Sequence, residues 1–336
     1  MTQRRSEGVP APAERGTARI AVDLLGGDEA PAVVVDGALH ACGADPDLHL
    51  LLVGPPEVAD EVIGALAPAE RPRVAVRSVH GAVGMAEAPT RASRPDTTVR
   101  AAVAAVAEGR ADAVVSAGAT GATVTAAVLG LGRMPGVRRP ALAATLPALA
   151  GPVVLLDVGA SVEASAAVLL RHAAIGAAYA IVLHDVAAPR VGLLSVGTEE
   201  GKGDRARRAA AAALAESRLP AGARYVGLVE GYDVSLGDRA DVVVTDGFTG
   251  NVLLKGVEGA YALAGGVPPG GRAPRAAALL GVAGIAVVCH GAASGEDLAS
   301  GIALAARLHR RAATAALSAL IKDFAELAGE TEGRTP

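Results

Sequence analysis

The stretch DVVVTDGFTGNVLLKGVEG, residues 241–259, joins an apolar run typical of a strand to an apolar segment typical of a helix. A glycine-rich turn, residues 246–250, connects them. The first N–H groups of a helix have no partners within the helix, and the helix dipole adds positive potential, so such a turn can bind an anion. Thr249 and Asn251 add side-chain hydrogen bonds, and Lys255 lies about one helical turn further on. A capped strand-to-helix turn without a ligand is the alternative interpretation.

The same pattern of strand, glycine-rich turn and helix recurs along the chain, within residues 19–42, 111–131, 153–179 and 191–204. This repetition favours the interpretation as an anion site, because ligands of open α/β sheets bind at the carboxyl ends of the strands. The residues that we expect to bind substrate or phosphate are Asp23, Gly26, Gly27, Ser116, Gly118, Thr120, Gly121, Asp157, Gly159, Gly247, Thr249, Gly250, Asn251 and Lys255.

Three residues are candidates for catalysis, namely Lys202, His290 and Asp246. Lys202 has a glycine on each side, which would let its ammonium approach a bound anion as a point charge; a solvated loop lysine is the alternative. His290 follows an apolar run and could donate a hydrogen bond to phosphate or a carbonyl group, or be a structural histidine. Cys289 beside it suggests a covalent acyl-cysteine route, but a cysteine that ends an apolar strand usually belongs to the core.

The composition narrows the class of protein. Of the 336 residues, 51% are hydrophobic but only 2% are aromatic, so small aliphatic residues must fill the core, which suits close packing of helices on a sheet. The net charge is −4 and no basic stripe is interleaved with aromatic residues, so we do not expect nucleic acid as a partner. Cys42 and Cys289 form no disulfide or metal pattern, and we expect no metal, no cofactor and a cytoplasmic location.

The chain is predicted to hold one α/β domain at residues 17–330. Residues 1–16 are polar, contain proline and lack the apolar segment of a signal peptide, so we expect a disordered tail there, and a frayed tail at 331–336. The apolar run from Ala141 to Leu156 is too interrupted to span a bilayer and predicts two strands around a turn. Residues 260–280 are rich in Gly and Pro and predict a flexible loop, and one helix is expected from about Glu296 to Leu327.

Six motifs, in this order, resemble those of the PlsX family, the bacterial phosphate:acyl-ACP acyltransferases. The resemblance covers about residues 17–320. It implies a three-layer α/β/α, Rossmann-like sandwich related to the isocitrate/isopropylmalate dehydrogenase fold, built as a homodimer. The motifs are DLLGGDEAP (23–31), VSAGATGA (115–122), DVGASVE (157–163), GTEEGKGD (197–204), TDGFTGNVLLKGVEG (245–259) and HG (290–291).

The resemblance also implies a reaction, in which an acyl group passes from an acyl carrier protein or CoA thioester to inorganic phosphate and gives acyl-phosphate. The residues suit that chemistry, because phosphorolysis needs a bound, oriented phosphate and donors for the oxyanion. The leaving thiol has a pKa near 8.5, so a strong general acid is not required. No protein nucleophile is needed.

The sequence departs from the family pattern at several positions. Glu29 stands where the family usually has His, which would add repulsion near a phosphate, and Ala119 replaces an Asn and removes hydrogen bonds. The long amphipathic helical hairpin of the family is replaced by the short stretch 262–276, so membrane contact is doubtful. Further replacements are Ser161 and Glu163 for Asn and Asp, Leu228 and Tyr232 for Asn and Arg, and Ala292 and Ala293 for serines.

Two other functions are open to a chain of this kind. The altered positions allow an unusual acyl chain or carrier in a specialised biosynthetic pathway, and they also allow a non-catalytic scaffold that binds an acyl carrier protein. The retained unit at 246–255 and Lys202 favour an enzyme, because a scaffold need not keep anion donors. An NAD-dependent dehydrogenase is disfavoured, because no GxGxxG motif follows a strand with an acidic residue about 20 positions later.

Overall fold

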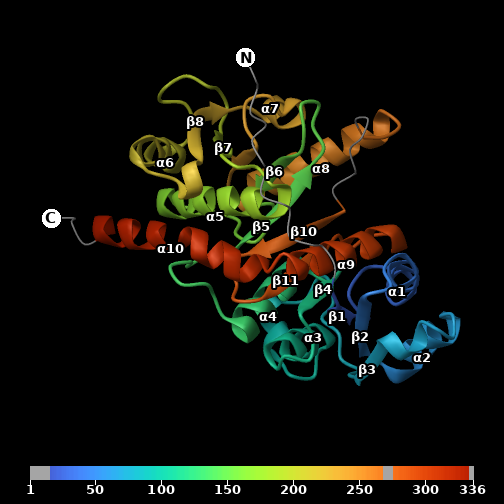
Figure 1. The fold of residues 1–336 in the computed structure, drawn as a ribbon. Helices are drawn as coiled ribbons and strands as arrows, with labels where there is room; N and C mark the ends of the chain where they lie inside the picture. Colours follow the sequence, from blue (N-terminus) through green and yellow to red (C-terminus); the bar gives the residue numbers. More distant parts are fainter. Residues whose placement is uncertain (1–15, 268–274, 333–336) are drawn as a thin grey trace, which may run out of the picture.

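A single mixed sheet runs through the computed structural model of the chain, which describes residues 16–267 and 275–332 (Figure 1). In the described residues the sheet has 11 strands in the order β3-β2-β1-β4-β11-β10-β5-β6-β9-β7-β8. The strands are β1 (Ala18–Asp23), β2 (Leu48–Gly54), β3 (Val74–Ser78), β4 (Ala113–Ser116), β5 (Ala141–Leu146), β6 (Val153–Leu156), β7 (Arg190–Leu194), β8 (Arg224–Val229), β9 (Val242–Val244), β10 (Ala276–Leu280) and β11 (Ile285–Cys289).

The sheet consists of two parallel halves that run in opposite directions. Strands β3, β2, β1, β4 and β11 are parallel to one another, and so are β6, β9, β7 and β8. Between them, three successive pairings are antiparallel: β11 with β10, β10 with β5, and β5 with β6. The carboxyl ends of β1, β4 and β11 therefore point away from those of β6, β9 and β7.

Helices cover both faces of the sheet, which gives three layers. Successive side chains of a strand point to opposite faces, so Ile20 and Val22 of β1 belong to one core cluster and Ala21 to the other. The first face is covered by α1 (Ala32–Ala44), α2 (Pro56–Ala65), α5 (Ala166–His184), α6 (Arg205–Glu216), α9 (Gly295–Arg310) and α10 (Ala313–Glu332). The second is covered by α3 (Thr98–Ala107), α4 (Thr120–Leu131), α7 (Gly231–Leu236) and α8 (Gly247–Leu263). The predicted Rossmann-like α/β/α sandwich is confirmed.

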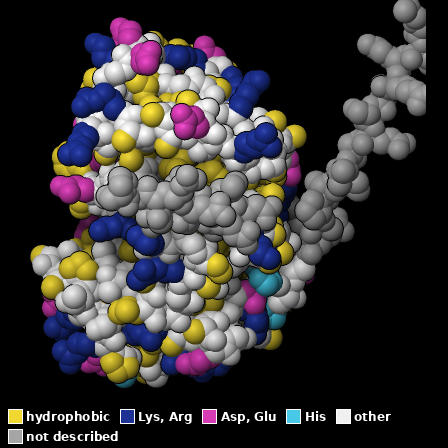
Figure 2. Space-filling view, turned by 90° about the vertical axis from the view of Figure 1, so that its left-hand side faces the viewer, with side chains coloured by type: hydrophobic (Ala, Val, Ile, Leu, Met, Phe, Trp, Pro, Cys, Tyr) yellow, Lys and Arg dark blue, Asp and Glu magenta, His cyan; other side chains and the backbone are white. Residues whose placement is uncertain are grey.

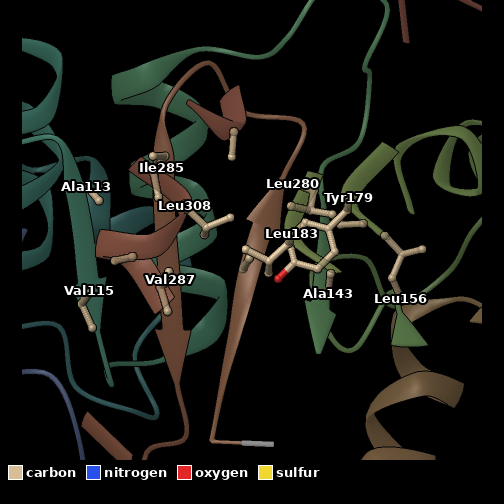
Figure 3. Packing of buried hydrophobic residues seen from close by; sticks show 14 of the residues in the cluster. Ala113, Val115, Ala143, Leu156, Tyr179, Leu183, Leu280, Ile285, Val287 and Leu308 are labelled. Atoms are coloured by element: carbon tan, nitrogen blue, oxygen red, sulfur yellow. The ribbon is translucent and has the colours of Figure 1, made fainter. Parts of the chain in front are cut away.

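The helix α5 lies in the core of the first face. Figure 3 shows its residues Tyr179 and Leu183 beside Leu280 of β10 and Ala143 of β5, all of them buried. Among the described residues, α5 is the one helix long and apolar enough to cross a membrane. Of its 18-residue apolar stretch, 61% is buried inside the structure. Its apolar character therefore follows from its place in the core.

Three sequence predictions can be compared with these elements. The apolar run from Ala141 to Leu156 forms the antiparallel hairpin β5–β6, as predicted. The loop predicted at 260–280 was wrong at both ends, because α8 continues to Leu263 and β10 begins at Ala276; residues 268–274 lie outside the described residues. The single helix predicted to close the domain is broken into α9 and α10 at Ala312, whose backbone φ is 48°.

Residues 1–15 and 333–336 of the predicted tails lie outside the described residues, whereas residues 331–332, predicted as part of the frayed tail, still belong to α10; the single-domain assignment stays a prediction. Figure 2 shows one face of the molecule. On its coloured atoms, Lys and Arg side chains are interspersed with Asp and Glu side chains. The coloured atoms of that face form no continuous basic stripe.

Candidate active site

The turn between β9 and α8 is held by Asp246, which caps the helix. Its carboxylate accepts hydrogen bonds from the backbone N–H and the hydroxyl of Thr249, both at 2.8 Å, and from the Arg207 guanidinium of α6 at 2.5 Å. Burial alone would raise the pKa of Asp246, but these donors outweigh burial and hold the pKa below its ordinary value. Asp246, predicted as catalytic, therefore fixes the start of α8, and its carboxylate is already saturated with partners.

Asp157 has a similar structural role after β6. Its two oxygens accept hydrogen bonds from the backbone N–H groups of Leu142, Gly159, Ala160 and Ser161, at 2.8–3.0 Å. The residue is fully buried, and burial raises its pKa while the hydrogen bonds from the Ala160, Leu142 and Gly159 N–H groups oppose that shift. Asp157, predicted to bind substrate, shapes this turn from inside the protein and does not face solvent.

The turns after β1 and β4 pack against each other. The Ser116 hydroxyl donates to Asp23 at 2.7 Å and accepts from the Gly118 N–H at 3.0 Å. Gly26 must be a glycine, because a Cβ there would lie 2.7 Å from the Gly118 nitrogen. Burial raises the pKa of Asp23. The adjoining cavity, lined by Thr98 and neighbours, has a volume of about 10 Å³, room for about one water molecule.

The helix α8 brings the two halves of the sheet together. At its start, the Asn251 amide donates to the Val158 carbonyl oxygen, after β6, at 3.1 Å. Four residues later the Lys255 ammonium lies 2.9 Å from Nδ1 of His290, which follows β11. Four helical residues span about 6 Å. The carboxyl ends of β6 and β11, although they point in opposite directions, are thus linked within one turn of α8.

A pocket lies under α8 at this junction. Its volume is about 40 Å³, room for about three water molecules, which is the scale of a small oxyanion. Polar groups come from both halves, with Thr120 at the start of α4, Asn251 on α8 and His290 after β11. Its apolar lining consists of Leu142, Ala144, Val158, Leu254, Ala276, Ala277, Val288 and Cys289.

Burial raises the pKa of the Cys289 thiol to about 12, which opposes thiolate formation and disfavours an acyl-cysteine route.

Three charged or ionisable side chains meet at the edge of this pocket. His290 Nε2 lies 2.8 Å from Oε1 of Glu258, and the Lys255 ammonium lies 3.3 Å from Oε2 of the same carboxylate. Burial alone would raise the pKa of Glu258, but the contacts with His290 and Lys255 lower it overall. Both ring nitrogens of His290 are therefore occupied, which changes its predicted role as a direct hydrogen-bond donor to substrate.

The other predicted site residues lie further from the pocket or serve packing. Lys202 is exposed in the loop between β7 and α6, and β7 pairs with β9, the strand that leads into α8. Gly247 and Gly250 allow close backbone contact, because a Cβ on either would lie within 2.5 Å of a carbonyl oxygen. Gly121 is pressed against Pro89, Gly27 lies near Gly291, and Gly159 lies near Asn251.

Two residues of this region were missed by the sequence analysis. Glu258 lies three residues after Lys255, a spacing that places both on one helix face, so its signal was present in the quoted stretch. Arg207 lies far from Asp246 in sequence, and nothing local indicated their contact. Among the described residues, no group of three or more His, Cys, Asp and Glu side chains could hold a metal ion.

Comparisons with known proteins agree with this architecture. A family model described as "Fatty acid synthesis protein" matches residues 18–267. A phosphate acyltransferase of Heliobacterium modesticaldum is 38% identical, with 85% of this chain and 92% of the relative covered. A phosphate acyltransferase of Pseudomonas putida strain GB-1 is 42% identical, with 73% of this chain and 72% of the relative covered.

Solved structures show the same fold at low sequence identity. The EutD phosphotransacetylase of Staphylococcus aureus superposes with a TM-score of 0.58 at 18% identity, over 89% of this chain and 94% of that one. A branched-chain phosphotransacylase of Enterococcus faecalis gives a TM-score of 0.56 at 15% identity, over 86% of this chain and 98% of that one.

Proposed function

The chain belongs to the PlsX family of phosphate acyltransferases and is an acyltransferase that uses phosphate, and we propose that its acyl donor is the thioester of an acyl carrier protein or of CoA. The observation that supports this site most strongly is the meeting of Thr120, Asn251 and His290 at one small pocket, with the Lys255 ammonium in contact with His290. The product is acyl-phosphate.

The pocket is suited to holding a phosphate ion as the nucleophile. The first N–H groups of α4 and the Thr120 hydroxyl supply donors on one side. The Lys255 ammonium, 2.9 Å from Nδ1 of the lining residue His290, supplies positive charge. A phosphate held between them loses the freedom that a bimolecular attack must otherwise overcome, and this orientation is a large part of what such a site contributes to rate.

The chemical step needs no covalent enzyme intermediate. A phosphate oxygen attacks the thioester carbonyl carbon and forms a C–O bond, and the carbonyl oxygen becomes an oxyanion. The oxyanion then collapses, the C–S bond breaks, and the thiolate leaves and takes a proton from water. Donors that favour the oxyanion over the ground-state carbonyl accelerate this step.

A trapping experiment tests the proposal. Acyl-carrier-protein and acyl-CoA donors of equal chain length are incubated with the full chain and phosphate, and acyl-phosphate is converted to acyl hydroxamate with hydroxylamine. We expect hydroxamate that depends on both enzyme and phosphate, with one of the two carriers preferred. If no chain length on either carrier gives turnover, the chain is instead a scaffold that binds an acyl carrier protein.

We also propose a homodimer in the cytoplasm, with no stable attachment to membranes. Exposed apolar side chains at the start of α8, Phe248 and Val252, and the neighbouring Val162 form a patch that a second copy could cover. The sequence of the shortened stretch at 262–276 argues against peripheral membrane insertion, because it is too rich in Gly and Pro for a long amphipathic helix.

A further inference from the structure

The contact between Lys255 and His290 fixes where the imidazole proton must be. A lysine ammonium can only donate hydrogen bonds, so Nδ1 of His290, 2.9 Å from Nζ, must accept through its lone pair. A neutral imidazole then carries its proton on Nε2, and that N–H points at Oε1 of Glu258, 2.8 Å away. The carboxylate is the acceptor that favours this tautomer over the other.

The surrounding elements hold the three groups in place. Lys255 and Glu258 are three residues apart on α8, so they project from the same face of the helix. The backbone after His290 is held by a hydrogen bond of 2.8 Å from the Asp28 N–H to the Gly291 carbonyl oxygen. A Cβ at Gly291 would lie 3.1 Å from the Asp28 carboxylate. The turn after β1 therefore fixes the histidine, and α8 brings the lysine and glutamate to it.

We propose that Glu258 is a positioning residue for acyl transfer to phosphate: it holds His290 in the Nε2–H tautomer, and Nδ1 of that ring holds the Lys255 ammonium at the edge of the pocket. This inference rests on the function proposed above. The side chain of Lys255 is 51% exposed, against 23% for Glu258 and 33% for His290. Without the histidine, a lysine this exposed would sample many rotamers.

The hydrogen bond and the charge of Glu258 have opposite effects on phosphate. Its hydrogen bond to His290 positions the Lys255 ammonium, whereas its negative charge repels phosphate. Glu258→Gln keeps an oxygen acceptor for Nε2–H and removes the charge. Glu258→Leu removes both with little change in volume. If Glu258 acts by positioning, Glu258→Leu impairs phosphate use and Glu258→Gln largely preserves it. If Glu258 acts through its charge alone, both variants change phosphate use alike.

Steady-state kinetics provide the first test. For Glu258→Leu we expect kcat/KM for phosphate to fall about tenfold, with the KM for the acyl donor within about twofold of wild type. For Glu258→Gln we expect kcat/KM for phosphate within about threefold of wild type. In a Lys255→Met background, Glu258→Leu should cause little further loss, because residues that act as a unit are not additive. Glu61→Leu, on the exposed face of α2, is the control.

The tautomer of His290 provides a second test, independent of turnover. In full-length protein labelled with 15N-histidine near neutral pH, we expect a protonated Nε2 and an unprotonated Nδ1 for His290, assigned by the loss of its signals in His290→Gln. Glu258→Leu should give a mixture of tautomers; if that variant does not fold, the wild-type spectrum alone decides. A wild-type His290 protonated on Nδ1 would overturn the proposal.

The outcomes separate this inference from the proposed function. A wild-type enzyme with no phosphate-dependent turnover refutes the function itself. A wild-type enzyme that turns over, together with a Glu258→Leu variant of unchanged kcat/KM or a Glu258→Gln variant as impaired as Glu258→Leu, refutes the positioning role and leaves the function standing.

Discussion

Two single carboxylates, the buried Asp157 and the partly buried Asp246, determine the shape of the turns after β6 and β9. Asp157 and Asp246 were both expected to touch substrate, yet each is surrounded by donors from its own protein. Their partners explain why the sequence could not show this: Leu142 lies 15 residues before Asp157, and Arg207 lies 39 residues before Asp246. A carboxylate at the end of a strand reads the same in sequence whether its partners are backbone N–H groups or a ligand.

The first prediction concerns Asp157. In Asp157→Asn, an amide N–H₂ replaces one carboxylate oxygen and faces backbone N–H donors, which leaves donors unsatisfied in the core. We expect a loss of about 3 kcal/mol or more in the free energy of unfolding, measured by urea denaturation. Asp60→Asn, on the exposed face of α2, is the matched control. A loss no larger than that of the control would mean that the four hydrogen bonds contribute little.

The second prediction concerns the lysines. Lys255→Met keeps most of the side-chain volume and removes the ammonium, so we expect the KM for phosphate to rise about tenfold, which corresponds to about 1.4 kcal/mol. Lys202→Ala should also weaken phosphate use by more than Lys322→Ala, on the exposed surface of α10. Phosphate titrations at saturating acyl donor measure both. An unchanged KM in Lys202→Ala would remove Lys202 from the site.

At the level of elements, α8 has the most influence on the site, because it begins at the carboxyl end of β9 and reaches His290 after β11. The strands and helices with clear periodicity, and the β5–β6 hairpin, were predictable from local pattern. The strand β10 was not, because its short Ala and Leu run follows a Gly- and Pro-rich stretch and owes its strand conformation to pairing with both β5 and β11. Long-range pairing of this kind overrides local propensity.

The third prediction concerns the last turn of α5. Burial, followed by the positive charges of Arg307 and Arg311, lowers the pKa of His184 to about 4, and its Nε2 lies 2.9 Å from the Thr145 hydroxyl. The unfolded chain, with a histidine pKa near 6.5, therefore takes up a proton before the native protein does. Stability is fully present above pH 6.5 and falls as the pH drops towards 4, by about 2 kcal/mol between pH 7.5 and pH 5.

Urea denaturation at those two pH values, for wild type and His184→Gln, measures this contribution. Glutamine can keep a hydrogen bond to Thr145 but does not titrate. The variant should therefore lose about 2 kcal/mol of the pH dependence, whatever its stability at pH 7.5. His49→Gln is the control, and an equal pH dependence in wild type and His184→Gln would contradict the assignment.

At the scale of the whole molecule, two parallel half-sheets of opposite direction share one sheet. The fold class followed from repeated strand–turn–helix units and from a core poor in aromatic residues. The reversal of direction did not, because it arises in the antiparallel pairings of β5 and β10. For this reason the predicted turns do not converge as one cluster at one sheet edge, and only Thr120, Asn251 and His290 among them line the pocket under α8.

The fourth prediction concerns assembly. If a second copy covers the patch of Val162, Phe248 and Val252, light scattering after gel filtration should give a mass of about 66 kDa, twice the chain mass of 33.1 kDa. The double variant Phe248→Asp and Val252→Asp should then shift the mass towards that of one chain. A wild-type mass of one chain, or a double variant that stays dimeric, would place the contact elsewhere or rule it out.

The central claim is that phosphate binds in the pocket where α8 joins the two half-sheets. A crystal structure of the full chain soaked in phosphate tests it most directly, with arsenate in a second crystal to identify the anion by its anomalous signal. We predict an anion within hydrogen-bonding distance of the Lys255 ammonium and of Thr120. An anion bound only in the loop that carries Lys202, or an empty pocket at phosphate concentrations that support turnover, would contradict the account.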